Sequence, residues 1–180
     1  MSIAEKYRPH YTYDDYVLWE GRWELIGGMP YAMSPAPNGR HQWVATELGA
    51  KFSTQLKGCR KCKVYQPIDW KIAEDTVVQP DLSIVRKPFN NNNYLDFPPS
   101  LVIEILSPST AQKDRREKYE LYEAERVKYY LIIDPAFKKV EIFELIDKTY
   151  QPVAVNPDLF TFHVDDNCKA DISFSDLFDE

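Results

Sequence analysis

The feature that most constrains the fold is the run LVIEIL at residues 101–106, which is apolar except for Glu104. A short, nearly unbroken apolar run is typical of a central strand in a sheet that is covered on both faces. A carboxylate in such a strand is costly to bury unless it is paired, protonated or bound to a metal ion. The run therefore predicts a covered sheet and leaves two interpretations of Glu104 open, a salt bridge to a Lys or Arg and a metal ligand.

Helical and strand-like patterns surround this run. Residues 22–26 and 30–33 are expected to form a hairpin around Gly27 and Gly28, and Tyr11–Glu20 a short helix. Apolar residues three or four apart predict an amphipathic helix over His41–Leu56. A second long helix is expected from a cap at Ser109 or Thr110 to about residue 124. The other predicted strands are Lys63–Ile72, Val77–Val85, Lys128–Asp134, Lys139–Leu145 and Tyr150–Val155.

Length and composition favour one globular domain covering residues 1–180, because 44% of the residues are hydrophobic and 14% aromatic. No apolar run is long enough to span a membrane, and the N-terminal segment has no apolar signal core, so we expect a cytoplasmic protein. The net charge of −6 argues against a protein that coats nucleic acid. It does not exclude a nuclease, since bound divalent cations neutralise substrate phosphate locally.

Asp81 supplies a second carboxylate at the start of another buried strand, after Pro80 and before Leu-Ser-Ile-Val. Alone, this aspartate would more simply cap a turn. If its strand lies beside the strand of Glu104, the two oxygen ligands suit Mg²⁺ or Mn²⁺ and leave room for water and phosphate.

The segments QPDLSIV, LVIEILSPSTAQKDRREKYELY and YYLIIDP resemble the PD-(D/E)XK nuclease superfamily. Within it, the chain is most similar to the Uma-two group of small restriction-endonuclease-like proteins, whose N-terminal segment also resembles WELIGGMPYAMSPAPNGRHQ. The resemblance implies a mixed α/β fold with a restriction-endonuclease-like core, a central curved mixed sheet flanked by helices. It also implies a Mg²⁺- or Mn²⁺-dependent endonuclease that hydrolyses phosphodiester bonds in nucleic acid, with DNA as the expected substrate.

The resemblance assigns roles to individual residues. It makes Asp81 and Glu104 the metal ligands of the site. The usual catalytic lysine would stand two residues after the acidic residue, but Leu106 occupies that position. In this group the lysine comes from the following helix, so Lys118 is the candidate amine, with Lys113 as the alternative.

Three further points follow from the resemblance. Glu24 and His41 match polar positions of the group and are candidates to complete the site, although an exposed strand residue and a histidine bonded to backbone are simpler interpretations. The group usually has Asp where Gly27 stands, so the turn near Glu24 can differ here. Without the resemblance, Lys118 would be interpreted as the surface ion-pair partner of Asp114.

The chain has three cysteines, an odd number in a sequence without a secretion signal. We expect free thiols rather than a disulfide framework. Cys59 and Cys62 have the C-x-x-C spacing of zinc and redox sites, but no second pair or histidine cluster follows to complete four ligands. We interpret this spacing as a coincidence.

Two alternatives to an endonuclease remain open. A non-catalytic nucleic-acid-binding or assembly module could keep the fold without turnover, and a metal-dependent hydrolase could act on a small phosphorylated substrate. Small nucleases of this fold often pair to cut two strands, so a homodimer is also an expectation.

Overall fold

A six-stranded mixed sheet forms the centre of the computed structural model, which describes residues 9–33, 37–87, 93–108 and 110–179. Strand β8 pairs in parallel with β9, and its other neighbour is antiparallel, as are all the remaining pairs of this sheet. A parallel pair needs a long crossover connection, and helices α4 and α5 provide it. In order across the sheet, the strands are β11 (Thr149–Val155), β10 (Lys139–Ile146), β9 (Tyr129–Asp134), β8 (Leu101–Ile105), β6 (Leu82–Val85) and β3 (Lys63–Tyr65).

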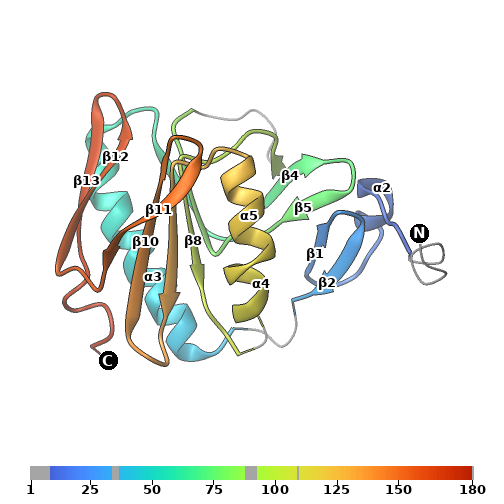
Figure 1. The fold of residues 1–180 in the computed structure, drawn as a ribbon, viewed down its shortest axis with the longest axis horizontal. Coiled ribbons are helices and arrows are strands. Elements are labelled where there is room, and N and C mark those ends of the chain that lie inside the picture. The colour runs from blue at the N-terminus through green and yellow to red at the C-terminus, as the bar shows by residue number, and fades with distance from the viewer. Residues whose placement is uncertain (1–8, 34–36, 88–92, 109, 180) are drawn as a thin grey trace.

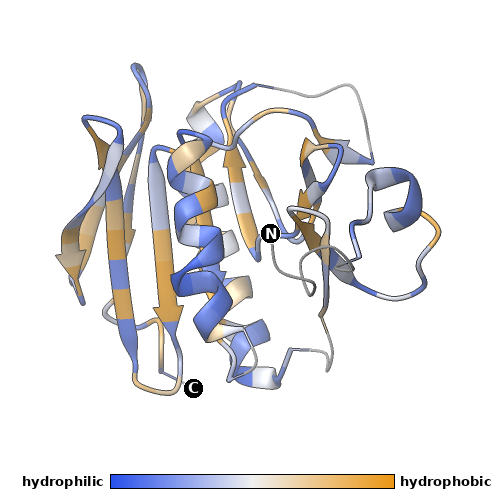
Figure 2. Cartoon of the chain, turned by 45° about the vertical axis from the view of Figure 1, so that its right-hand side comes forward, coloured by the Kyte–Doolittle hydropathy of each residue, from blue (hydrophilic) through white to orange (hydrophobic). Residues whose placement is uncertain are grey.

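Different elements cover the two faces of the sheet (Figure 1). Helix α3 (Gly39–Gln55) and the hairpin of β12 (Leu159–Asp165) and β13 (Cys168–Ser173) pack on one face. Helices α4 (Ala111–Arg115) and α5 (Glu117–Ala124) lie over the other. Figure 2 shows hydrophobic colours along the sheet strands and mainly hydrophilic colours on the outer side of the helix crossing the sheet. The predicted mixed fold, with a central sheet flanked by helices, is confirmed.

Alternation along β8 decides where Glu104 points. Leu101, Ile103 and Ile105 belong to the core beneath α3, whereas Val102 belongs to the core beneath α5. Successive side chains of a strand point to opposite faces, so Glu104 shares the face of Val102 and is directed toward α5.

A second, five-stranded sheet packs beside the first, and its formation corrects two predictions. The predicted strand Lys63–Ile72 is divided between β3 and β4, and Val77–Val85 between β5 and β6. Pro67 and Pro80 stand at the two breaks, where the missing N–H interrupts the hydrogen-bond ladder and the chain passes from one sheet to the other. The order of strands is β2 (Met29–Ala32), β1 (Trp23–Ile26), β5 (Thr76–Val78), β4 (Asp69–Ala73) and β7 (Tyr94–Leu95).

The predicted hairpin and helices are present with altered bounds. Gly27 and Gly28 form the β1–β2 turn with φ angles of 55° and 75°, so glycine permits this turn without the acidic residue of the family pattern. Helix α2 is shorter than predicted, at Tyr13–Tyr16, and a 3₁₀ turn η1 (Leu56–Gly58) follows α3. Thr110 is the N-cap residue of α4, while Ser109 lies outside the described residues.

The helix predicted to run to about residue 124 is interrupted at Arg116, whose φ of −124° and ψ of −81° are not helical. The break divides the crossover into α4 and α5. Among the described residues, no helix is both long and apolar enough to cross a bilayer.

The expectation of three free thiols is wrong. Cys59 and Cys168 form a disulfide, with Cα atoms 5.8 Å apart, and Cys62 stays a free, buried thiol. The β12–β13 hairpin was not predicted, and it is this hairpin that folds back over α3 and carries Cys168 to the C-x-x-C turn. A cross-link between such distant residues could not be deduced from their spacing.

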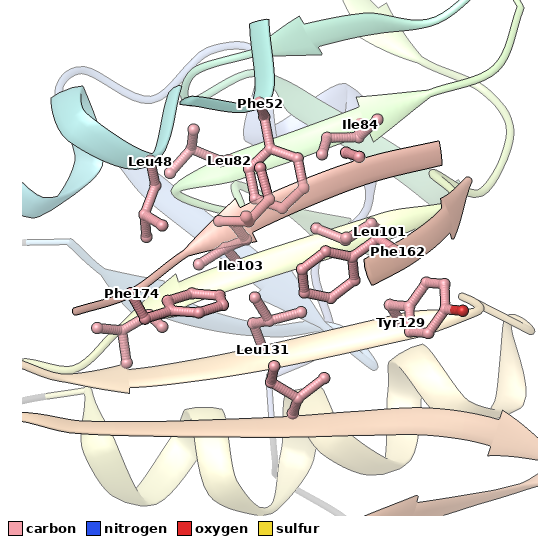
Figure 3. Packing of buried hydrophobic residues seen from close by; sticks show 14 of the residues in the cluster. Leu48, Phe52, Leu82, Ile84, Leu101, Ile103, Tyr129, Leu131, Phe162 and Phe174 are labelled. Carbon is pink, nitrogen blue, oxygen red and sulfur yellow. The ribbon is translucent and has the colours of Figure 1, made fainter. Parts of the chain in front are cut away.

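Aromatic packing between α3 and the β12–β13 hairpin provides a test of this arrangement. Phe52 is completely buried, with its ring centroid 5.3 Å from that of Phe162 (Figure 3). We expect Phe52→Ala to lower the free energy of unfolding by about 3 to 5 kcal/mol, through lost burial and a cavity. Phe137→Ala is the matched control, because Phe137 is 82% exposed. Urea denaturation measures both, and equal effects would contradict the packing.

Candidate active site

Two carboxylates meet where strands β6 and β8 border a cleft of about 630 Å³. Leu82 pairs with Ile103 in antiparallel register, which places Asp81, just before β6, next to Glu104 on β8. The backbone N–H of Ile105 donates to Asp81 Oδ2 at 2.8 Å and fixes this carboxylate. The predicted proximity of Asp81 and Glu104 is therefore present, and both line the cleft.

Lys118 lies at the centre of a buried ion-pair cluster. Its Nζ is 2.8 Å from Glu104 Oε1 and 2.7 Å from Glu24 Oε1. Asp114, four residues earlier on α4, places its Oδ1 3.5 Å from the same nitrogen. Because Lys118 is only 1% exposed, the interpretation as a surface ion pair with Asp114 is wrong.

Glu24 on β1 joins both candidate lysines. Its Oε1 accepts from the backbone N–H of Gln79 at 2.8 Å as well as from Lys118, and its Oε2 contacts Lys113 Nζ. Glu24 is fully buried, so the interpretation as an exposed strand residue is wrong. Both carboxylate oxygens are engaged, and this leaves Glu24 suited to holding the lysines in place.

Burial and charge act in opposite directions on the ionisation of these groups. Burial raises the pKa of Glu104 well above its usual value even though Lys118 opposes this, and burial likewise raises the pKa of Asp114. Burial also acts to raise the pKa of Glu24, but the charges of Lys118 and Lys113 outweigh it and the pKa is lowered. Burial acts to lower the pKa of Lys118, yet Glu104, Glu24 and Asp114 raise it well above the usual value. Lys118 is therefore a protonated ammonium at neutral pH.

His41 lies at the start of α3 and reaches the same cleft. Its Nε2 is 3.1 Å from Asp81 Oδ2, and its backbone N–H donates to Asn38 Oδ1, the N-cap side chain, at 2.9 Å. The side chain thus contacts a carboxylate, so the simpler interpretation of a histidine side chain bonded to backbone is wrong.

Two participants were not assigned a role from the sequence. The hydroxyl of Tyr122 donates to Glu104 Oε1 at 2.7 Å, and Asp114 is buried within the cluster. Tyr122 follows Lys118 by four residues, so it shares its helix face, and it is the last residue of the D-R-x-x-K-x-x-x-Y pattern. Asp114 is the first residue of that pattern, so the pattern could have indicated both Asp114 and Tyr122 as members of the site.

The cleft carries more negative than positive charge. Its lining includes the carboxylates of Asp81, Glu104, Asp114 and Glu117 and the cations Arg22, Lys113 and Lys118, and the buried carboxylate of Glu24 contacts both lysines. A divalent cation would balance this excess. Asp81 and Glu104 are hard oxygen donors, and Mg²⁺ commonly binds one or two carboxylates while it keeps several waters. The residues present therefore fit such an ion.

Residues 13–170 match the model of the Uma2 family, which is described as "Putative restriction endonuclease". The chain belongs to the Uma2 family. This confirms the resemblance drawn from its motifs, and the description of the family supports a nuclease-like function.

Two individual proteins are similar to this Uma2 chain. An uncharacterized protein of Synechocystis sp. is 27% identical over 149 residues, covering 77% of this chain and 76% of its own length. A solved structure from Anabaena variabilis, described as "a putative nuclease belonging to DUF820", superposes with a TM-score of 0.75 and 22% identity. The match covers 93% of this chain and 97% of the solved one, and it confirms the restriction-endonuclease-like fold.

The ion-pair cluster makes a prediction about stability. Lys118→Met leaves buried carboxylates without their common partner, and we expect it to lower the free energy of unfolding by about 3 to 5 kcal/mol at pH 7. The loss should shrink as the pH falls from 7 toward 5. The charge of Lys118 lowers the pKa values of Glu104 and Asp114, so in the variant both pKa values, already raised by burial, rise further. The native variant then binds protons more readily than its unfolded chain does, and it regains stability as the pH falls.

Urea denaturation at several pH values measures this effect. Lys169→Met is the matched control, because the Lys169 side chain is 64% exposed in a surface pair, and it should change stability little. A loss for Lys118→Met that stayed constant between pH 7 and 5 would contradict the charge-cluster explanation.

Proposed function

We propose that the protein is a Mg²⁺- or Mn²⁺-dependent endonuclease that hydrolyses phosphodiester bonds in nucleic acid, with DNA as the substrate. The observation that carries the proposal is the adjacency of Asp81 and Glu104 at a cleft whose buried carboxylates outnumber its lysines. Membership of the Uma2 family supports the same activity.

Asp81 and Glu104 would hold the metal ion. When bound, such an ion lowers the pKa of a coordinated water and neutralises charge on the phosphate. The N–H of Ile105 holds Asp81 in position, and the hydroxyl of Tyr122 does the same for Glu104. Both carboxylates are thus oriented before any substrate arrives, which reduces the reorganisation that binding requires.

Lys118 is suited to stabilising negative charge. Because its raised pKa keeps it protonated, it does not act as the base that removes a proton from water. A fixed ammonium beside the reacting phosphate would instead stabilise the charge that develops on the phosphoryl oxygens. Among the described interactions of the two lysines, only Lys118 contacts Glu104, which favours it over Lys113 for this role.

Glu24 and His41 act as positioning residues in this proposal. Glu24 fixes both lysines through separate oxygens, and the N-terminal hairpin that carries it thereby holds α4 and α5 against the cleft. His41 lies beside Asp81 Oδ2 and connects the start of α3 to the same carboxylate.

Metal binding can be tested without knowledge of the substrate. We expect Mn²⁺ to bind the wild-type protein in calorimetry and to lose that binding in Asp81→Asn and Glu104→Gln, which keep side-chain shape but remove charge. Glu117→Gln is the matched control, because Glu117 lines the same cleft but is exposed. Mn²⁺ binding that survived in both Asp81→Asn and Glu104→Gln would contradict the proposed ligands.

Turnover is tested on DNA and RNA with Mn²⁺ present. Glu104→Gln and Lys118→Met should each reduce cleavage by at least about 100-fold, the scale of a lost electrostatic contact in a transition state. Cleavage by Glu104→Gln as fast as wild type would overturn the assignment. DNA binding without turnover would indicate a non-catalytic module, and turnover only on small phosphate esters would indicate a different hydrolase.

A further inference from the structure

Three sulfur atoms converge at a point that shares no residue with the lining of the active-site cleft. The sulfur atoms of Cys59, Cys62 and Cys168 all lie within 4.8 Å of one another. Cys62 Sγ is 3.5 Å from Cys168 Sγ, although the two residues are 106 positions apart. The chain has three cysteines in total, so every one of them is at this point.

Local backbone structure directs two of the sulfurs to the same side. The N–H of Cys62 donates to the carbonyl of Cys59 at 2.9 Å and closes a turn between η1 and β3. Cys168, the first residue of β13, is packed against the same core cluster as this turn. The cysteine sulfurs therefore connect the turn between η1 and β3 to the β12–β13 hairpin.

A dedicated disulfide needs two cysteines, and this cluster has three. The Cys59–Cys168 disulfide leaves Cys62 as a third thiol in contact with it. Once the disulfide is reduced, the Cys62 thiol can therefore bind a ligand together with the other two sulfurs.

We infer that Cys59, Cys62 and Cys168, in their reduced state, form a binding site for one thiophilic divalent ion, of which Zn²⁺ is the typical example, with the three thiolates as its protein ligands. Zinc–sulfur bonds of about 2.3 Å in a tetrahedron separate neighbouring sulfurs by about 3.8 Å, close to the 3.5 Å between Cys62 Sγ and Cys168 Sγ. Cys59 and Cys168, which are bonded in the disulfide, would have to separate on reduction to reach this spacing.

The disulfide and the metal site exclude each other, because a sulfur in the disulfide cannot bind as a thiolate. A phosphine reductant converts the disulfide into two thiols, and the phosphine takes up an oxygen atom from water. The three thiols then release three protons as they bind the ion as thiolates. In either state the cluster ties the C-terminal hairpin to the end of α3, so the site is structural and independent of the phosphodiester chemistry.

Cobalt reports on this site without reference to catalysis. We expect the full chain, reduced with a phosphine under anaerobic conditions, to bind one Co²⁺ with the near-ultraviolet charge-transfer absorption of cobalt–thiolate bonds, and to release it to Zn²⁺. Oxygen ligands at Asp81 and Glu104 do not produce this absorption. Failure here is therefore distinguishable from failure of the proposed active site.

Cys62→Ser is the decisive variant, because it removes one sulfur and leaves Cys59 and Cys168, so the oxidised variant can be purified with its disulfide and then reduced for the measurement. Circular dichroism of the reduced variant checks that the fold is kept. Cys62→Ser should weaken Co²⁺ binding by more than about 100-fold. Loss of a side chain that only hydrogen-bonds to a metal ligand costs about 10- to 100-fold in metal affinity, and loss of a ligand itself should cost more. Asp166→Asn, an exposed control in the turn before Cys168, should leave Co²⁺ binding unchanged. Absence of thiolate absorption in the reduced wild type, or an unchanged spectrum in Cys62→Ser, would overturn the inference.

Discussion

The structure depends on one buried ammonium group. Lys118 bridges carboxylates from a strand of each sheet and from the preceding helix, and removal of water from these charges is tolerable only because they are paired. The same pairing raises the pKa of Lys118 and limits how far burial raises that of Glu104. A buried ion-pair cluster contributes less to stability than apolar packing of equal volume, so its presence at a cleft indicates a functional arrangement.

Much of the fold could be predicted because hydrophobic periodicity reports directly on burial. The run containing Glu104 is the central strand β8, and the periodic segment from His41 onward is α3. The predictions failed where the chain changes sheets, at Pro67 and Pro80. At such points the apolar pattern continues although the chain leaves one sheet and enters the other. Only the tertiary structure shows which strands pair with each other.

The candidate site was predictable to the extent that its residues lie in a distinctive local pattern. Glu104 and Lys118 were found this way, and alternation along β8 accounts for their meeting. The role of Glu24 in joining two lysines could not be derived, because it depends on where the N-terminal hairpin packs. Cys168 was also missed as a partner of Cys59, since the hairpin that carries it gave no clear pattern and the two residues are separated by 109 positions.

Wide separation in sequence has a further consequence for the polar cluster. Glu24 and Lys113 are 89 residues apart, and the remaining members come from segments between and after them. Only a fragment that extends from Glu24 to Tyr122 contains every member of the arrangement, so a shorter nascent chain lacks part of it. Contacts between such distant segments form late in folding. A phosphodiester-cleaving centre would therefore exist only in molecules whose two sheets had already docked.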